Sequence, residues 1–328
     1  MGEDLRLQVR RADVSRNDPR AEEAARKEVI LRTLLSHAID YAGLFPPAQL
    51  DMQGAVAEYE SYRASSDEWA LGRFVVPAAR LDELATAAGE TITKPLGAEH
   101  AERRLSVVLG ADLAADVARV RGFMGQARGH AWWGGVDAVE LRASTPEAIA
   151  DATRAVPDSV ERYVEIPVAG DPTPLVRAIG EAGAFAKIRT GGTTADAFPA
   201  SGHVVRFLAT CLREEVPFKA TAGLHHPLRG EYPLTYEPGS ACGRMYGFLN
   251  VFLATASLAA GLDEPEARLL LEETDPRAIT FSRTAVVWRG HRFSLDRLAE
   301  SRRFLTSFGS CSFREPIDDL TALGLLSS

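Results

Sequence analysis

The 328-residue chain is long enough for one large barrel or two modest domains, and its composition, 46% hydrophobic and 25% charged, is that of a globular protein. Its 45 acidic and 37 basic residues leave a net charge of −8, which disfavours nucleic acid or an anionic membrane as a partner because a negative surface repels phosphate groups. The three cysteines show neither a disulfide pattern nor metal-finger spacing, and the longest apolar run, Met245 to Ala260, is too short to span a bilayer comfortably. We therefore expect a cytoplasmic protein with no membrane partner.

Short β-type runs alternate with helices along most of the chain. Residues 1–17 predict a mobile arm, and residues 18–328 predict a single domain that begins with a helix at 19–37. Strands separated by single helices need right-handed crossovers and therefore form a parallel sheet. The pattern predicts a (β/α)8 TIM barrel. Its strands are expected at 38–45, 71–76, 105–109, 136–141, 162–168, 185–188, 217–222 and 304–310, with capped helices at 52–62, 146–155, 172–180 and 204–212 and a last helix at 318–326.

The seventh and eighth strands are separated by about 80 residues, 223–303, which we expect to form an insertion at the barrel mouth. The stretch up to Gly243 is typical of a loop. An apolar helix at 246–260, a second helix near 265–273 and a β-type run at 279–288 follow. An alternative places the eighth strand of the barrel at 284–288.

Charged side chains lie within or at the ends of four predicted strands, where barrel enzymes carry their active sites. They are Glu140 and Arg142 in the fourth strand, Glu165 in the fifth, Lys187 and Arg189 in the sixth, and Lys219 in the seventh. A buried ammonium group either pairs with an acid or loses its proton and becomes a nucleophilic amine. Two lysines on neighbouring strands would also repel each other and depress the pKa of one of them. The competing interpretation is a purely structural ion network.

Two motifs resemble those of a known enzyme family. Lys187-Ile-Arg-Thr-Gly-Gly and Lys219-Ala-Thr-Ala-Gly, 32 residues apart, are similar to the strand-six and strand-seven motifs of deoxyribose-phosphate aldolases and related class I aldolases. The resemblance implies that Lys187 forms a Schiff base, that Lys219 tunes it, and that Asp137 assists proton transfer. Arg189 replaces a small residue of the family, and Leu224-His225-His226-Pro227 stands where the family has a short phosphate-binding loop. These departures leave the substrate open.

Further residues at the strand ends are predicted to contact the substrate. His225 is a candidate acid or base, and we expect only one of the two adjacent histidines to face inward because consecutive side chains diverge. Two glycine-rich segments could present backbone N–H groups to an anion. The predicted substrate-binding residues are Asp40, Arg142, Arg189, Thr190, Gly191, Gly192, His226, Gly309, Ser310 and Ser312.

The sequence thus predicts a lyase of the class I aldolase type that acts, without a cofactor, on a small anionic carbonyl substrate. Lys187 would form an imine, Glu140, Glu165 or His225 would move protons, and Arg142 and Arg189 would bind a carboxylate or phosphate. In one alternative, Glu140 and Glu165 hold a divalent metal that stabilises an enolate. In the other, the barrel binds a ligand or assembles without catalysis. The apolar helix at 246–260 and the leading helix at 19–37 leave surface for a homo-oligomer.

Overall fold

Eight parallel strands close into a barrel in the computed structural model, which describes residues 19–92, 103–127 and 135–326. The strand order around the barrel is β1–β13–β7–β6–β5–β4–β3–β2. The bounds are β1 Ile39–Tyr41, β2 Leu71–Pro77, β3 Leu105–Val108, β4 Ala138–Arg142, β5 Glu161–Glu165, β6 Phe185–Arg189, β7 Phe218–Thr221 and β13 Leu305–Ser310. Each overlaps a predicted strand, so the (β/α)8 architecture is confirmed. The predicted arm at 1–17 lies outside the described residues.

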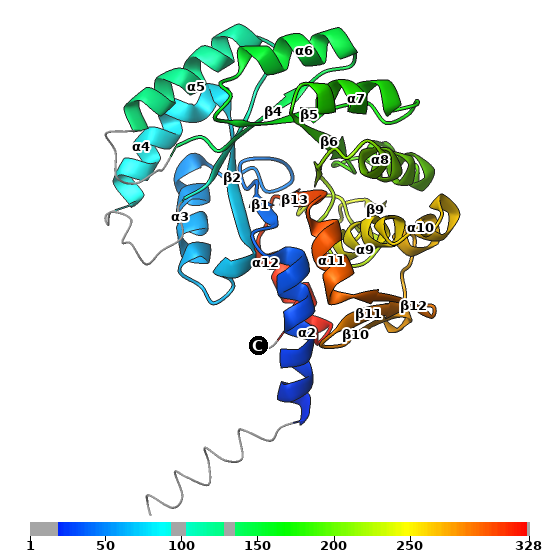
Figure 1. The fold of residues 1–328 in the computed structure, drawn as a ribbon. Coiled ribbons are helices and arrows are strands. Elements are labelled where there is room, and N and C mark those ends of the chain that lie inside the picture. The colour runs from blue at the N-terminus through cyan, green and yellow to red at the C-terminus, as the bar shows by residue number, and fades with distance from the viewer. Residues whose placement is uncertain (1–18, 93–102, 128–134, 327–328) are drawn as a thin grey trace, which may run out of the picture.

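Helices surround the barrel (Figure 1). They are α2 Pro19–Leu35, α3 Met52–Arg63, α4 Leu81–Thr91, α5 Leu113–Ala127, α6 Pro146–Ala155, α7 Thr173–Glu181, α8 Ser201–Arg213 and α12 Arg314–Ala322. Local sequence explains where several begin. The Asp51 side chain accepts a hydrogen bond from the Gly54 N–H (2.7 Å) at the start of α3, and Thr145 accepts one from Ala148 (3.2 Å) at the start of α6. No helix within the described ranges is long and apolar enough to cross a membrane.

The segment between β7 and β13 differs in part from the predicted insertion. It contains the hairpin β8 Gly230–Pro233 and β9 Cys242–Met245, then α9 Phe248–Ala259 and α10 Glu264–Leu271, the antiparallel sheet of β10 Ile279–Phe281, β11 Ala285–Trp288 and β12 His291–Ser294, and finally α11 Leu295–Arg302. The alternative position of the eighth barrel strand at 284–288 is wrong. That run is β11, which pairs antiparallel with β10 and β12, whereas β13 closes the barrel between β1 and β7.

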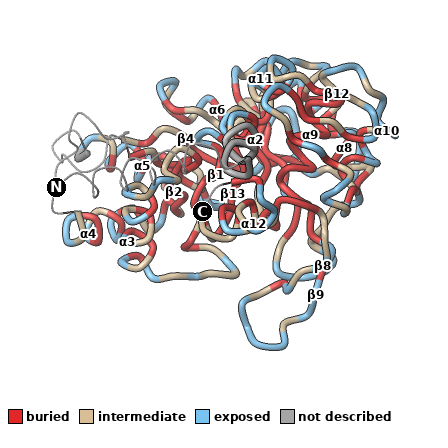
Figure 2. The backbone as a smooth tube through the Cα atoms, turned by 90° about the horizontal axis from the view of Figure 1, so that it is seen from below, coloured by how far each residue is buried: buried red, intermediate tan, exposed pale blue. Residues whose placement is uncertain are grey.

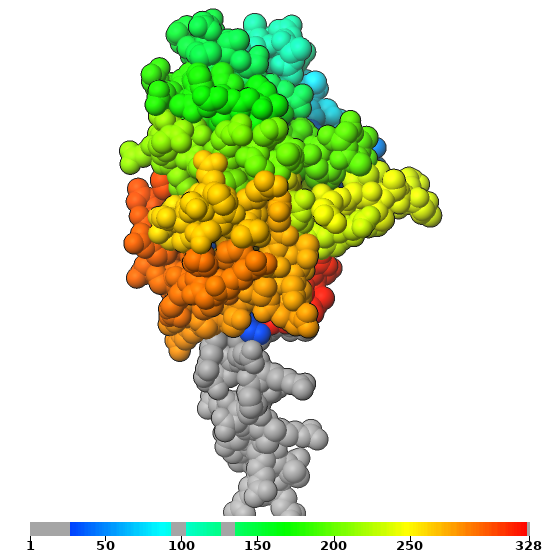
Figure 3. Space-filling view, turned by 90° about the vertical axis from the view of Figure 1, so that its right-hand side faces the viewer, coloured from blue at the N-terminus to red at the C-terminus, as the bar shows by residue number. Residues whose placement is uncertain are grey.

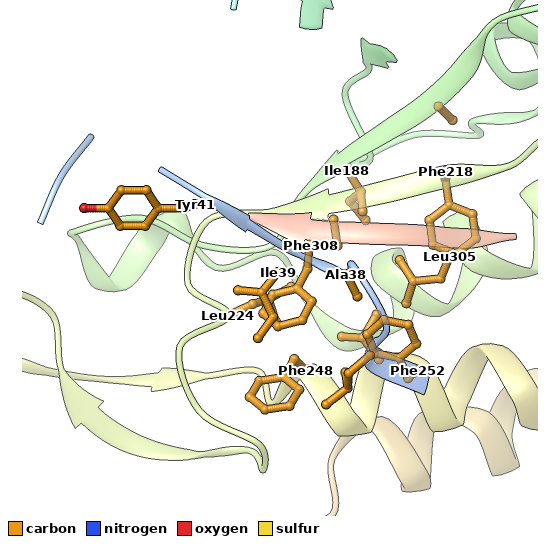
Figure 4. Close-up of a cluster of buried hydrophobic side chains, with 14 of the residues drawn as sticks. Ala38, Ile39, Tyr41, Ile188, Phe218, Leu224, Phe248, Phe252, Leu305 and Phe308 are labelled. Carbon is orange, nitrogen blue, oxygen red and sulfur yellow. The ribbon is translucent and has the colours of Figure 1, made fainter. Parts of the chain in front are cut away.

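Only part of this segment lies at the barrel mouth. Helix α9 packs on the outside of β13, where the Phe248 ring stacks on Phe308 with centroids 4.9 Å apart and Phe252 meets the same ring edge-on (Figure 4). The helix therefore belongs to the outer helical layer, because its apolar residues need the sheet to cover them. The β8–β9 hairpin, in contrast, projects from the body with a mostly exposed tip, visible in yellow in Figure 3 and in pale blue in Figure 2.

The interior of the barrel is filled by side chains in layers, as expected of this fold. Near the amino ends of the strands, Arg73 Nη2 contacts Glu161 Oε2 at 2.6 Å. The Tyr163 hydroxyl donates to the same carboxylate oxygen (3.1 Å) and lies 3.1 Å from Thr306 Oγ1. This layer closes the barrel from below, and the next layer toward the carboxyl ends contains the predicted lysines.

Candidate active site

Lys187 and Lys219 lie side by side inside the barrel, bridged by one carboxylate. They are register partners on the neighbouring strands β6 and β7. Glu140 on β4 lies between them, with Oε2 at 2.8 Å from the Lys187 Nζ and Oε1 at 2.7 Å from the Lys219 Nζ. The prediction that both amines enter a shared interior is confirmed. The two ammonium groups act on each other through Glu140, so the expected direct repulsion is offset by the negative charge between them.

Asp40 on β1 completes the surroundings of Lys219. Its Oδ2 atom lies 2.6 Å from the Lys219 Nζ and accepts a hydrogen bond from Ser307 Oγ at 2.7 Å. Its Oδ1 atom accepts from the Arg73 backbone N–H at 2.8 Å. Asp40 was predicted to contact the substrate, but it is fully buried in β1 and reaches the lysine instead. Its role is to hold the Lys219 ammonium.

Burial and pairing fix the charges in this layer. Lys219 is 0% exposed and Glu140 2% exposed. Burial favours the neutral amine of Lys219, but Asp40 and Glu140 outweigh it and raise the pKa of Lys219 above its usual value. Burial likewise opposes the charge on Glu140, yet the two lysines hold the pKa of this carboxyl well below its usual range. Lys219 is therefore a fixed cation at neutral pH.

Glu165 on β5 links Lys187 to two arginines at the barrel mouth. Its Oε2 atom lies 2.9 Å from the Lys187 Nζ, and its Oε1 atom lies 3.0 Å from Arg142 Nε and 3.4 Å from Arg189 Nε. Burial opposes ionisation of Glu165, but Lys187, Arg189 and Arg142 lower its pKa. The arginine side chains are 70% and 46% exposed, so their outer guanidinium N–H groups remain open to an anion.

A cavity of about 900 Å³ opens above this layer. The predicted site residues that line it are Glu140, Arg142, Lys187, Arg189, Gly191, Gly192, Lys219, His225, His226 and Gly309. Lys187, Lys219 and Glu140 lie at its floor, and Arg142 and Arg189 lie on its wall. Lys187, at 6% exposed, is the more accessible of the two lysines. The geometry therefore distinguishes them, with Lys187 open to a ligand and Lys219 enclosed by Asp40 and Glu140.

His225 and His226 both line this cavity, so the expectation that only one would face inward is wrong. The reason is that both rings reach the same helix. His225 Nδ1 lies 3.1 Å from Glu315 Oε2, and His226 Nδ1 lies 2.7 Å from Asp319 Oδ2, one turn further along α12. The His226 ring also stacks on Tyr232 of the hairpin at 3.6 Å.

His225 belongs to a cluster that sequence reasoning did not predict. The Tyr236 hydroxyl, from the hairpin tip, donates to Glu315 Oε2 (2.7 Å) and lies 3.3 Å from Cys311 Sγ, which is itself 3.8 Å from His225 Nδ1. Burial opposes the charge on His225, but Cys311 and Glu315 raise its pKa to about 10. The ring is therefore an imidazolium at neutral pH. No local motif connects these residues, because Tyr236 and Glu315 are 79 positions apart.

Asp137 is not part of the site, which corrects its predicted role in proton transfer. It precedes β4 at the amino end of the barrel, and its carboxylate accepts a hydrogen bond from the Leu105 N–H at 2.6 Å. Side chains alternate between the two faces of β4, and the chain advances about 3.3 Å per residue. Glu140, three residues beyond Asp137, therefore reaches the level of the lysines, and Asp137 does not.

Close packing explains why glycine occupies positions 191 and 192 of the first glycine-rich segment. A Cβ atom on Gly191 would clash with the Phe198 ring, and one on Gly192 would meet the Ala197 Cβ at 2.8 Å. Both glycines line the cavity, as does Gly309. Thr190 Oγ1 donates to the Ala222 carbonyl at 2.7 Å and thereby ties the ends of β6 and β7 together.

Ser310 and Ser312 use their hydroxyl groups within the turn before α12. Ser310 Oγ donates to the Ser312 carbonyl (2.6 Å), and Ser312 Oγ accepts from the Glu315 N–H (3.2 Å). These bonds position Glu315 beside His225. The predicted contact of the two serines with substrate stays a prediction.

Lysine is rare in this chain, so two lysines inside the barrel point to a role that arginine does not fill. Of its 37 basic residues only four are lysines, at positions 27, 94, 187 and 219. Two of these four lie inside the barrel. Arginine supplies positive charge equally well but stays protonated in proteins, whereas a lysine amine can lose its proton and attack a carbonyl carbon.

Comparisons with known proteins do not assign the chain to a family. A scan against protein-family models finds no match, and a search of curated proteins finds none either. Within the part of the chain that the structure describes, no three or more His, Cys, Asp or Glu side chains are placed to hold a metal ion. The likeness to class I aldolases remains a resemblance of two motifs.

Proposed function

We propose that the protein is a carbon–carbon lyase that acts on an anionic carbonyl compound through a Schiff base on Lys187. One observation carries the proposal. The Lys187 amine lies at the floor of a large cavity, within 3 Å of two carboxylates, on a layer that also holds a second, permanently charged lysine. Imine chemistry needs an amine at this place, whereas a metal-held enolate or simple ligand binding does not.

The reaction needs no external oxidant or reductant. The Lys187 nitrogen attacks the carbonyl carbon of the substrate, and loss of water gives an imine. The bond between the carbons α and β to the imine carbon then breaks, and its electron pair moves toward the imine nitrogen to give an enamine. A base removes the proton of the β-hydroxyl group, which becomes the new carbonyl. Protonation of the enamine carbon and hydrolysis of the imine release the second product and the free lysine.

The carboxylates around Lys187 provide for these proton movements. Glu140 and Glu165 both contact the Lys187 Nζ, and Glu165, which does not share its charge with Lys219, is the one that can accept a proton when the amine attacks. Lys219 keeps Glu140 charged in a buried layer, which makes it a positioning residue for Lys187. His225 and Tyr236 also line the cavity. His225 carries a proton at neutral pH because its pKa is raised, so it can donate that proton to a leaving oxygen.

Borohydride trapping tests the proposal. The folded protein is incubated with pyruvate or glyoxylate, reduced with borohydride and mapped by peptide mass spectrometry, with only four lysines to distinguish. We expect a reduced adduct on Lys187 in the wild type and none at that position in K187R. The matched control K27R removes a lysine on α2, away from the cavity, and should retain the wild-type adduct.

The same experiment separates catalysis from a structural ion network. K187R retains the positive charge, so its thermal unfolding should remain close to that of the wild type while the adduct disappears. If folded wild-type protein gives no adduct on Lys187 with any of these compounds, or reacts equally at Lys27, the Schiff-base proposal is wrong and the ion network is structural.

A further inference from the structure

The cavity has two chemically different sides. Two residues beyond Glu140 and Lys187, in the next inward position of β4 and β6, are Arg142 and Arg189. On β2 and β3 the residues that line the cavity are Val75 and Val108, and Val108 is the register partner of Glu140. All four line the cavity. The wall above β4–β6 is therefore cationic, and the wall above β2 and β3 is apolar.

The loops extend the apolar wall outward. Phe45, Pro46 and Pro47 follow β1, and Leu109 and Leu113 follow β3, and all of them line the same cavity. A three-carbon oxo acid has six non-hydrogen atoms and fills on the order of 180 Å³ at roughly 30 Å³ per atom, the share of one water molecule in the liquid. The cavity has about 900 Å³. The predicted small substrate would leave the apolar side to water.

We infer that the preferred substrate is a 2-oxo acid that carries the hydroxyl group needed for cleavage and, beyond it, an apolar tail of several carbons, bound by its carboxylate at Arg142 and Arg189 and by its tail against Val75 and Val108. This inference rests on the proposed function, because the carbonyl is placed at Lys187. In such an acid the carboxylate and the tail leave the carbonyl carbon on different sides. Lys187 lines the same cavity as both walls, so a molecule of sufficient length can contact the amine, the arginines and the valines.

Straight-chain carboxylic acids that lack a carbonyl test the apolar wall separately from the imine. Calorimetric titration with acetate, butyrate, hexanoate and octanoate measures the dissociation constant along the series. Each methylene buried against an apolar wall strengthens binding by about fourfold, the equivalent of ≈0.8 kcal/mol per CH₂ at 25 °C. We expect a steady gain up to at least hexanoate. In trapping experiments, 2-oxooctanoate should saturate Lys187 at much lower concentration than pyruvate.

Two variants of adjacent valines on β3 supply a matched pair. Val108 faces the cavity, whereas Val107 faces outward into the buried core between sheet and helices. V108T places a hydroxyl in the apolar wall without changing its size and should lower the gain per methylene. V107T, which makes the same change on the other face of the strand, should leave the gain unchanged even if it lowers thermal stability.

Two results overturn the inference. Dissociation constants that do not change with chain length in the wild type would show that the tail stays in water. An equal loss in V107T and V108T would show that the effect is not local to the cavity. Failure of the proposed function looks different, because the acid series would still bind in order of length while no oxo acid formed an adduct with Lys187.

Discussion

Replacing Glu140 by glutamine tests whether the ion network is the centre of the site. E140Q removes the negative charge between two lysines and places an amide N–H group opposite an ammonium group. Removing one partner of a buried ion pair costs about 3–5 kcal/mol, because the remaining charge is left uncompensated. With an unfolding entropy of about 2.1 cal/mol/K per residue for 328 residues, this cost corresponds to a fall in melting temperature of roughly 4–7 °C. Urea and thermal unfolding followed by circular dichroism measure both quantities.

The pH dependence of E140Q adds a second measurement with a defined sign. The pKa of Glu140 is lowered in the folded chain, so its contribution to stability is present above the ordinary glutamate value of about 4.3 and declines as the pH falls below it. The wild type should lose stability more steeply than E140Q in this range. The control E147Q, an exposed glutamate on α6, should change stability by less than about 1 kcal/mol. Equal stability of E140Q and the wild type at pH 7 would refute the reasoning.

Two further predictions concern the walls of the cavity. Because the pKa of His225 is raised from 6.5 to about 10, its stabilising contribution is complete below pH 6.5 and declines as the pH rises toward 10. Unfolding experiments at a series of pH values should show this loss of stability in the wild type and in the control H203N. The stability of H225N should depend less on pH over the same range. R142Q and R189Q should each weaken hexanoate binding by up to about fivefold, with less effect at high salt, because both side chains are partly solvated. R154Q, an exposed arginine on α6, serves as the control in calorimetry, and an equal loss in this variant would contradict a direct contact.

The barrel could be predicted from the sequence because its signals are local. Each strand is a short apolar run and several helices begin at an N-cap residue such as Asp51 or Thr145, so no long-range information is needed to place them. The lysine pair could also be predicted. An ammonium in an otherwise apolar strand has few stable environments, and the spacing of one βα unit places Lys187 and Lys219 at the same level.

The rest of the site depends on side-chain contacts between distant segments. Asp137 and Glu140 are both acidic residues near β4, and only the position of the strand's inward face decides which one reaches the lysines. The contact between Tyr236 and Glu315 needs the hairpin to bring its tip to α12. Gly230-Glu-Tyr-Pro233 gives a weak strand pattern because glycine and proline are unfavourable in strands, which explains why the hairpin was predicted as a loop.

The local charge of the site explains why an acid is the expected ligand although the whole chain carries −8. Three carboxylates and four cationic side chains form one connected network, which leaves one positive charge when all are ionised. The network consists of Asp40, Glu140, Glu165, Lys187, Lys219, Arg142 and Arg189. A bound monoanion neutralises this charge, and it does so at the arginines, which are the most exposed members. An alcohol or an aldehyde of the same size would exclude water from the guanidinium groups without compensating their charge, so it should bind more weakly than the acid.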